Sequence, residues 1–129
     1  MIRLAVLILA PLPALAAPIA TPSGLEVNWV ETLQDAQGPD GLTARFRFLA
    51  PGIKGGEAAG LDLQAVSADM QWLCDSFALP RLSSTGPRPQ QIVISLADSE
   101  IPFGETDPEV TQFFEAYRPG AETCEWEMF

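Results

Sequence analysis

The side chains best able to do chemistry in this sequence are carboxylates, which gather in its last third. Positions 98 to 127 hold a single base, Arg118, and nine acids: Asp98, Glu100, Glu105, Asp107, Glu109, Glu115, Glu122, Glu125 and Glu127. Two carboxyl groups in different environments can hydrolyse a glycoside, and a flexible acidic loop can bind Ca²⁺. No pair is marked by its spacing, and 98–109 does not follow the helix–loop–helix calcium pattern. We therefore favour a solvated acidic surface and predict no catalytic and no metal-ligating residues.

Histidine is absent from the sequence, which removes the usual general base at neutral pH and a common metal ligand. Serine–histidine and cysteine–histidine catalysis are thereby excluded. Gly52, Gly55 and Gly56 do not form a phosphate-binding loop, because no Gly-Lys-Ser/Thr sequence follows them. We expect no cofactor and a non-catalytic binding or structural protein. A carboxylate-based hydrolase of envelope material and a calcium-responsive module are the alternatives.

Arg45 and Arg47 stand two positions apart, on one face of a predicted strand. Such a pair can bind a carboxylate or phosphate group, but we favour pairing with Glu26 or another acid on a neighbouring strand. Exposed aromatic side chains such as Phe129 could support strand addition by a partner. The formal net charge of −10 repels nucleic acid and anionic lipid, so the expected partner is a protein or a small ligand.

The first sixteen residues have the features of an export signal. Arg3 precedes the apolar run 4–10, two prolines follow, and Ala14 and Ala16 supply the small residues that a signal peptidase reads. We predict a cleaved signal peptide over 1–16, a single domain over 17–129 and a periplasmic location. Ala17 is not a cysteine, so we expect no lipid anchor, and no later stretch is apolar enough for stable membrane insertion.

The two cysteines, Cys74 and Cys124, are predicted to form a disulfide, since export places them in an oxidising compartment. The closed loop of about 50 residues corresponds to about 4 kcal/mol of stability in the chain-entropy description. We expect reduction to lower stability severely and to release the C-terminal strands.

Alternating apolar residues predict two strands in the first half of the chain. Leu25, Val27 and Trp29 form the first. In the second, over 42–50, Leu42, Ala44, Phe46 and Phe48 share one face, and Thr43, Arg45 and Arg47 share the other. Between them 34–41 (QDAQGPDG) is rich in turn formers, which predicts an exposed loop inside an antiparallel hairpin.

One helix is predicted after a flexible, glycine-rich connection over 51–60. Its apolar face consists of Met70, Leu73, Cys74 and Phe77. Ser67 is the expected cap, Asp69 lies near the positive end of the helix dipole, and Pro80 ends the helix. Leu63 and Val66 fit the same face, so a start near Asp62 is the alternative.

Three further strands complete the prediction. Ile92 to Leu96 is apolar on both faces, which is typical of a central strand. A polar loop over 98–108 follows, with Phe103 expected to pack onto the core, and 111–118 and 123–129 form a terminal hairpin. The order strand-strand-helix-strand-strand-strand predicts an α+β fold: a mostly antiparallel sheet of about five strands with one helix packed on a face. The disulfide would tie the last strand to that helix.

Five segments carry a family resemblance: LTARFRF (42–48), DMQWLCDSFALP (69–80), GPRPQQIVISLAD (86–98), PFGETDPEVTQFFEAYR (102–118) and CEWEMF (124–129). They resemble a group of short exported alphaproteobacterial proteins known as a domain of unknown function. The resemblance implies a periplasmic protein and brings no activity or catalytic residues. Some members are labelled acetolactate synthase, but a thiamine-diphosphate enzyme needs several hundred residues and a metal–diphosphate site.

Overall fold

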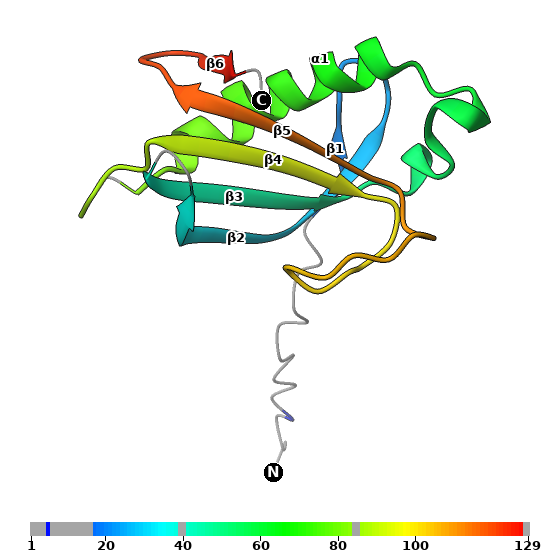
Figure 1. Cartoon of the computed structure of the whole chain (residues 1–129), viewed down its shortest axis with the longest axis horizontal. Coiled ribbons are helices and arrows are strands. Elements are labelled where there is room, and N and C mark those ends of the chain that lie inside the picture. The colour runs from blue at the N-terminus through cyan, green and yellow to red at the C-terminus, as the bar shows by residue number, and fades with distance from the viewer. Residues whose placement is uncertain (1–4, 6–16, 39–40, 84–85, 128–129) are drawn as a thin grey trace.

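The structure, a computed structural model, describes residues 5, 17–38, 41–83 and 86–127. The predicted signal peptide over 1–16 therefore lies outside the described residues, Ala5 excepted, and so does Phe129. One sheet and one α-helix make up the described part of the chain (Figure 1). Their bounds are β1 (Ile19–Ala20), β2 (Glu26–Gly38), β3 (Gly41–Leu49), α1 (Leu63–Leu73), β4 (Gln91–Ala97), β5 (Gln112–Pro119) and β6 (Cys124–Glu127).

The six strands lie in the sheet in the order of the chain. Every neighbouring pair is antiparallel except β3 and β4, which run parallel on either side of the connection through α1. The mostly antiparallel sheet and its helix agree with the prediction, but five strands and the predicted order are wrong. The missed strand is β1, whose two residues lie between Pro18 and Pro22 and pair with Val27 and Glu26. Prolines lack the N–H that a longer ladder requires.

The β2–β3 hairpin is longer than the sequence suggests. The predicted exposed loop over 34–41 is wrong, because Ala36, Gln37 and Gly38 pair with Thr43, Leu42 and Gly41. Irregularities in register between Trp29 and Glu31, and between Leu33 and Ala36, interrupt the ladder without ending it. Turn-forming residues are thus accommodated inside a strand.

Helix α1 begins at the earlier of the two expected positions. Asp62 is its cap and accepts hydrogen bonds from the backbone N–H groups of Gln64 and Ala65, at 3.0 and 3.3 Å. Ser67 therefore lies inside the helix, and the prediction that it is the cap is wrong. Pro80 does not end the helical stretch either, since a π-helical turn over Cys74–Ala78 and a 3₁₀ turn over Leu79–Arg81 follow α1.

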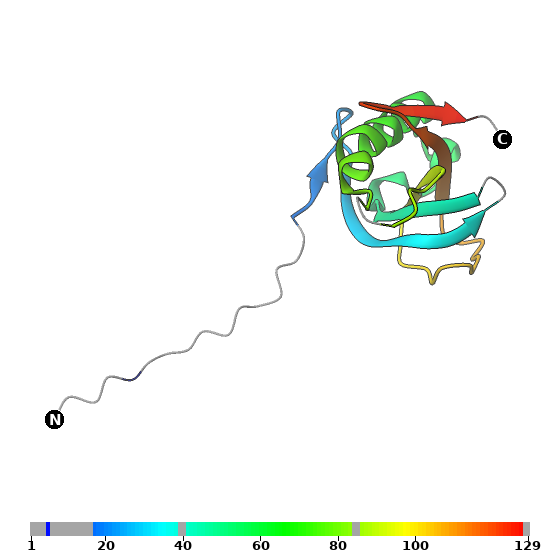
Figure 2. The same ribbon diagram turned by 90° about the vertical axis from the view of Figure 1, so that its left-hand side faces the viewer.

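The sheet curls around α1, so that the helix lies on its concave side (Figure 2). The core is formed there by Ala44, Phe46, Phe48, Ile92, Ile94, Leu96 and Tyr117 of the sheet and by Val66, Met70, Leu73 and Cys74 of the helical stretch. All seven residues of β4 are buried, which confirms the prediction of a central strand. Cys74 and Cys124 form the predicted disulfide, with their Cα atoms 6.1 Å apart, and tie β6 to the helical stretch.

The two longest connections differ from their predictions. Residues 51–60 are ordered into two 3₁₀ turns, with Ile53 fully buried, rather than forming a flexible linker. Phe103, expected to pack onto the core, is 52% exposed. It belongs to the loop between β4 and β5, which crosses the convex side of the sheet, away from α1 (Figure 2).

Candidate functional site

A cleft on the convex side of the sheet is the candidate functional site. Its volume is about 650 Å³, within the range of small-molecule sites. The strands β2, β3 and β4 form its floor, and the loop after β4 forms its wall. The residues around it are Val30, Glu31, Leu33, Arg47, Phe48, Leu49, Ser95, Ala97, Ser99, Glu100, Ile101, Pro102 and Phe103. Eight of these thirteen residues are apolar, and the five polar ones comprise two serines, the base Arg47 and two acids, Glu31 and Glu100.

Strand alternation places both predicted arginines on this convex side. Phe46 points into the core, so its neighbours Arg45 and Arg47 point the other way. In the parallel ladder Arg45 is level with Val93, and Arg47 with Ser95. Ser95 in turn lies opposite Phe114, whose ring is 51% exposed. The convex side therefore carries cationic and aromatic side chains in an otherwise acidic chain.

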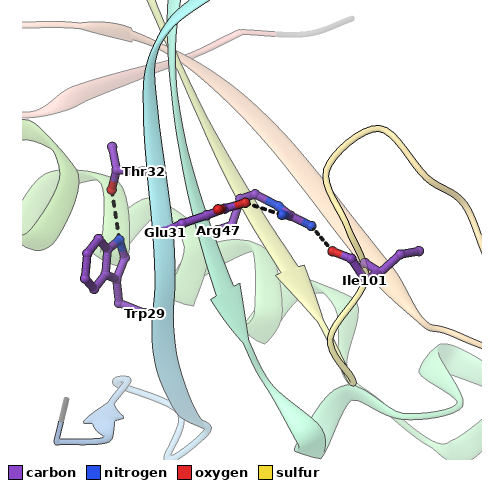
Figure 3. Close-up of polar contacts among 5 residues, drawn as sticks. All are labelled: Trp29, Glu31, Thr32, Arg47 and Ile101. Atoms are coloured by element: carbon purple, nitrogen blue, oxygen red, sulfur yellow. Dashed lines mark hydrogen bonds and ion pairs between the residues drawn. The ribbon is translucent and has the colours of Figure 1, made fainter. Parts of the chain in front are cut away.

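Arg47 joins the sheet to the loop after β4 (Figure 3). Its Nη1 donates to Glu31 Oε1 and forms an ion pair with that carboxylate, and its Nη2 donates to the backbone carbonyl of Ile101. Pairing with an acid of the neighbouring strand confirms the favoured expectation, although the partner is Glu31 and not Glu26. The Arg47 side chain is 15% exposed and that of Glu31 is 41% exposed, so the bridge is shielded on the arginine side only; it connects β3 to the loop over the cleft.

For Arg45 the expected pairing with an acid is not found, since no polar partner for it occurs among the described residues. Its Nε is buried and makes no hydrogen bond, and no carboxylate among the described residues forms an ion pair with it. The guanidinium lies over the ring of Phe103, with its central carbon 5.5 Å from the ring centroid; the corresponding distance for Arg47 is 5.9 Å. Phe103 and Arg47 thus line the cleft, and Arg45, which is not a lining residue, reaches it through its contact with Phe103.

The acidic residues of the last third do not converge. No group of three or more acidic or cysteine side chains that could hold a metal ion occurs in the described part of the chain. Glu100 borders the cleft, whereas Glu105, Asp107 and Glu109 are exposed along the loop. Glu127 accepts from Gln91 Nε2 at 3.1 Å and lies 3.4 Å from Arg118 Nε. These carboxylates therefore behave as separate surface groups.

The sequence alone identified Arg45 and Arg47 as candidates but missed the groups that make the cleft. Glu31 and Ile101 carried no signal, because both come into place only through the strand register and the path of the loop. Phe103 was noticed and assigned to the core. An aromatic residue between Pro102 and Gly104 in a polar loop, opposite two arginines on a strand, is the signal that could have found it.

No helix of the described residues is both long enough and apolar enough to cross a membrane. The comparison with known families gives one match: the model for the Family of unknown function (DUF6497) matches residues 6–129, so the chain belongs to that family. No curated protein matches the chain, and no solved structure does.

Proposed function

We propose that this member of the DUF6497 family is a non-catalytic binding protein. Its ligand is a molecule with an apolar body and a carboxylate head, held in the convex cleft. The observation that carries the proposal is Arg45, which lies over Phe103 at the edge of the cleft, has a buried Nε without a hydrogen bond, and forms no ion pair with any carboxylate of the described residues.

Electrostatics favours an anionic head group. A buried polar group without a hydrogen bond, such as the Arg45 Nε, is unfavourable, and the residue as a whole is half-buried. A carboxylate at the rim of the cleft compensates the charge of Arg45. Arg47 assists it, because Glu31 and Ile101 use only two of the N–H groups of its guanidinium.

The walls of the cleft favour an apolar body. Val30, Leu33 and Ile101 border the space, and Phe103 covers its edge with a half-exposed ring. Burial of apolar surface contributes about 25 cal/mol per Å², so a short alkyl chain gains affinity from these contacts. The carboxylate then sets the orientation of the ligand.

Titration with octanoate, followed by backbone and arginine Nε–H resonances in ¹⁵N–¹H NMR spectra, tests the proposal. We expect saturable shifts at Arg47, Ser95 and Phe103, with octan-1-ol binding more weakly. The Arg45→Met variant should bind octanoate about tenfold more weakly, the magnitude of one charged hydrogen bond.

Arg81→Met is the matched control. Arg81 also lies over a phenylalanine ring, at 3.7 Å from its centroid, but that ring is Phe77, which lines a different pocket, whereas Arg45 lies over Phe103 of the convex cleft. The control removes the same charge and should bind octanoate as the unaltered protein does. Equal losses in the two variants, or no saturable shift with octanoate, would overturn the proposal.

We also propose that the protein acts in the periplasm after removal of residues 1–16. The Cys74–Cys124 disulfide supports this location, since disulfides persist in oxidising compartments. An intact mass of protein taken from its own periplasm without reductant tests it. The expected mass begins near Ala17 and lacks two hydrogens; a chain that keeps residues 1–16 contradicts the proposal.

A further inference from the structure

A second pocket lies on the other side of β2 from the convex cleft, at the edge of the sheet. Its volume is about 460 Å³, and its lining residues are Ala17, Ile19, Trp29, Thr32, Phe77 and Arg81. None of these six residues lines the convex cleft. The pocket is therefore separate from the convex cleft; of the arguments below, only the positive charge at Ala17 rests on the proposed removal of residues 1–16.

Two aromatic rings form its walls. Trp29 and Phe77 have centroids 6.3 Å apart with planes inclined at 40°, which leaves no room for a third ring between them. Trp29 is nevertheless 39% exposed, so part of its ring faces the open space. Its indole N–H donates to Thr32 Oγ1 at 2.8 Å (Figure 3), which fixes the ring and satisfies its polar atom. A planar apolar group can stack on this exposed surface.

Among the described residues that line this pocket, Arg81 alone is charged. Its guanidinium stacks on Phe77 and donates from Nη1 to the backbone carbonyl of Phe77 at 3.0 Å. No carboxylate among the described residues forms an ion pair with Arg81. Stacking holds the guanidinium plane in place and leaves N–H groups free at its edge, the geometry that binds a carboxylate.

The edge of β2 beside the pocket is poorly suited to an added strand. Two register irregularities interrupt it, and such bulges discourage edge-to-edge pairing. Gln34 further along the edge is held by the 81–83 segment: its Oε1 accepts from the N–H of Ser83, and its Nε2 lies 3.5 Å from the carbonyl of Arg81. A small molecule fits these constraints better than an extended peptide.

We propose that this edge pocket binds a small planar aromatic carboxylate, which stacks on Trp29 and pairs with Arg81. Charge complementarity selects the acid, since Arg81 is a cation that forms no ion pair with any of the described carboxylates. Cleavage after Ala16, which the sequence predicts, would place the new α-ammonium group of Ala17 at the same pocket. That second positive charge also favours an anionic ligand.

The indole N–H resonance of Trp29 in a ¹⁵N–¹H spectrum is the readout, assigned by its loss in Trp29→Phe. The chain has three tryptophans, and the other two serve as internal controls. The probes are 2-naphthoate and its neutral counterpart, 2-naphthamide. We expect a saturable shift of the Trp29 resonance alone, with naphthoate binding about two- to fivefold more tightly, as an exposed ion pair allows.

Arg81→Met should abolish the preference for naphthoate, while Arg81→Lys should retain part of it and shows that the pocket is intact. Arg45→Met, which alters the convex cleft, should leave the preference unchanged. Similar binding of the two probes by the unaltered protein would overturn the inference, as would shifts of all three indole resonances. Because the two sites respond to different arginines, failure of one proposal is distinguishable from failure of the other.

Discussion

At the scale of single residues, Asp69 is the strongest polar anchor in the described structure. It is 1% exposed, in the middle of α1, and was expected near the start of the helix as a partner for the dipole. Its carboxylate instead accepts hydrogen bonds from Thr21 Oγ1 at 2.9 Å, from the N–H of Ser23 at 3.1 Å, and from Ser23 Oγ. The turn between β1 and β2 is thereby fastened to the helix.

We predict that Asp69→Ala lowers the free energy of unfolding by about 3 kcal/mol, because it leaves buried donors unpaired. Urea denaturation measures the change. Asp62→Ala is the comparison, since it removes an exposed helix cap worth about 1 kcal/mol. A loss for Asp69→Ala no larger than that for Asp62→Ala would contradict the anchoring role.

Tyr117, the single tyrosine, gives a prediction for alkaline pH. Burial first, and then the charges of Glu115 and Asp75, raise its pKa well above the usual value of 10.0. Above about pH 10 the unfolded chain therefore loses the phenolic proton while the folded protein keeps it, so stability falls as pH rises. Below about pH 10 both the folded and the unfolded chain keep the phenolic proton, so the contribution of Tyr117 to the free energy of unfolding is fully present.

Ultraviolet absorbance of tyrosinate should show no titration of the folded protein through pH 10 and normal titration in urea. The midpoint of urea unfolding should decline above pH 10, and Tyr117→Phe should reduce this decline. A native titration near pH 10 would contradict the assignment.

The sequence predicts single residues correctly where the alternation of a strand decides which face of the sheet a side chain occupies. The faces of Arg45 and Phe46 follow from the period of two. The prediction failed for Asp69 and Phe103, because a partner 46 or 48 residues away, or the path of a loop, has no local signature.

At the scale of elements, β6 is held to the helical stretch by more than the disulfide. The N–H of Cys124 donates to Asp75 Oδ1 at 2.7 Å, and Gln71 Nε2 donates to the carbonyl of Cys124 at 2.8 Å. Gln71 also donates to Asp75 at 3.0 Å. We refer to Gln71 and Asp75 as the clamp. Together they form hydrogen bonds with both the N–H and the carbonyl group of Cys124 in β6.

The clamp alters the expected result of removing the disulfide. The double variant Cys74→Ala/Cys124→Ala should lose up to about 4 kcal/mol, but β6 should stay paired with β5. Adding Asp75→Ala should then release β6. Hydrogen exchange of the β6 amides distinguishes the steps, with Asp62→Ala added as the control. Full exposure of β6 in the double variant would show that the disulfide alone holds it.

Element prediction was accurate for β3 and β4, whose apolar patterns are clear, and for the two strands of the terminal hairpin, whose positions the Pro119–Gly120 turn separates. The end of β2 was missed because turn-forming residues continue a ladder that Thr43 and Leu42 complete from the other strand. Such pairing depends on the partner strand, so local propensity gives the wrong answer.

At the scale of the whole molecule, net charge is the dominant electrostatic feature. A charge of −10 on 129 residues repels itself and weakens the folded state. Salt screens such repulsion, so raising the ionic strength from about 0.01 M to about 0.15 M should raise the free energy of unfolding by roughly 1 kcal/mol. For a domain of this size that corresponds to a rise of about 4 °C in melting temperature.

Screening of the acidic charge and specific binding of Ca²⁺ predict different effects of the two divalent cations. The carboxylates along 98–109 are dispersed, and three or more do not meet among the described residues. Calcium and magnesium chloride at equal ionic strength should therefore raise the melting temperature equally. Glu105→Gln/Glu109→Gln should reduce both effects alike, because it removes charge from the loop and not ligands from a site. If calcium alone raised the melting temperature, and the double variant lost that rise, the loop would be a calcium site. These acids would then act by coordinating the ion and not through diffuse repulsion.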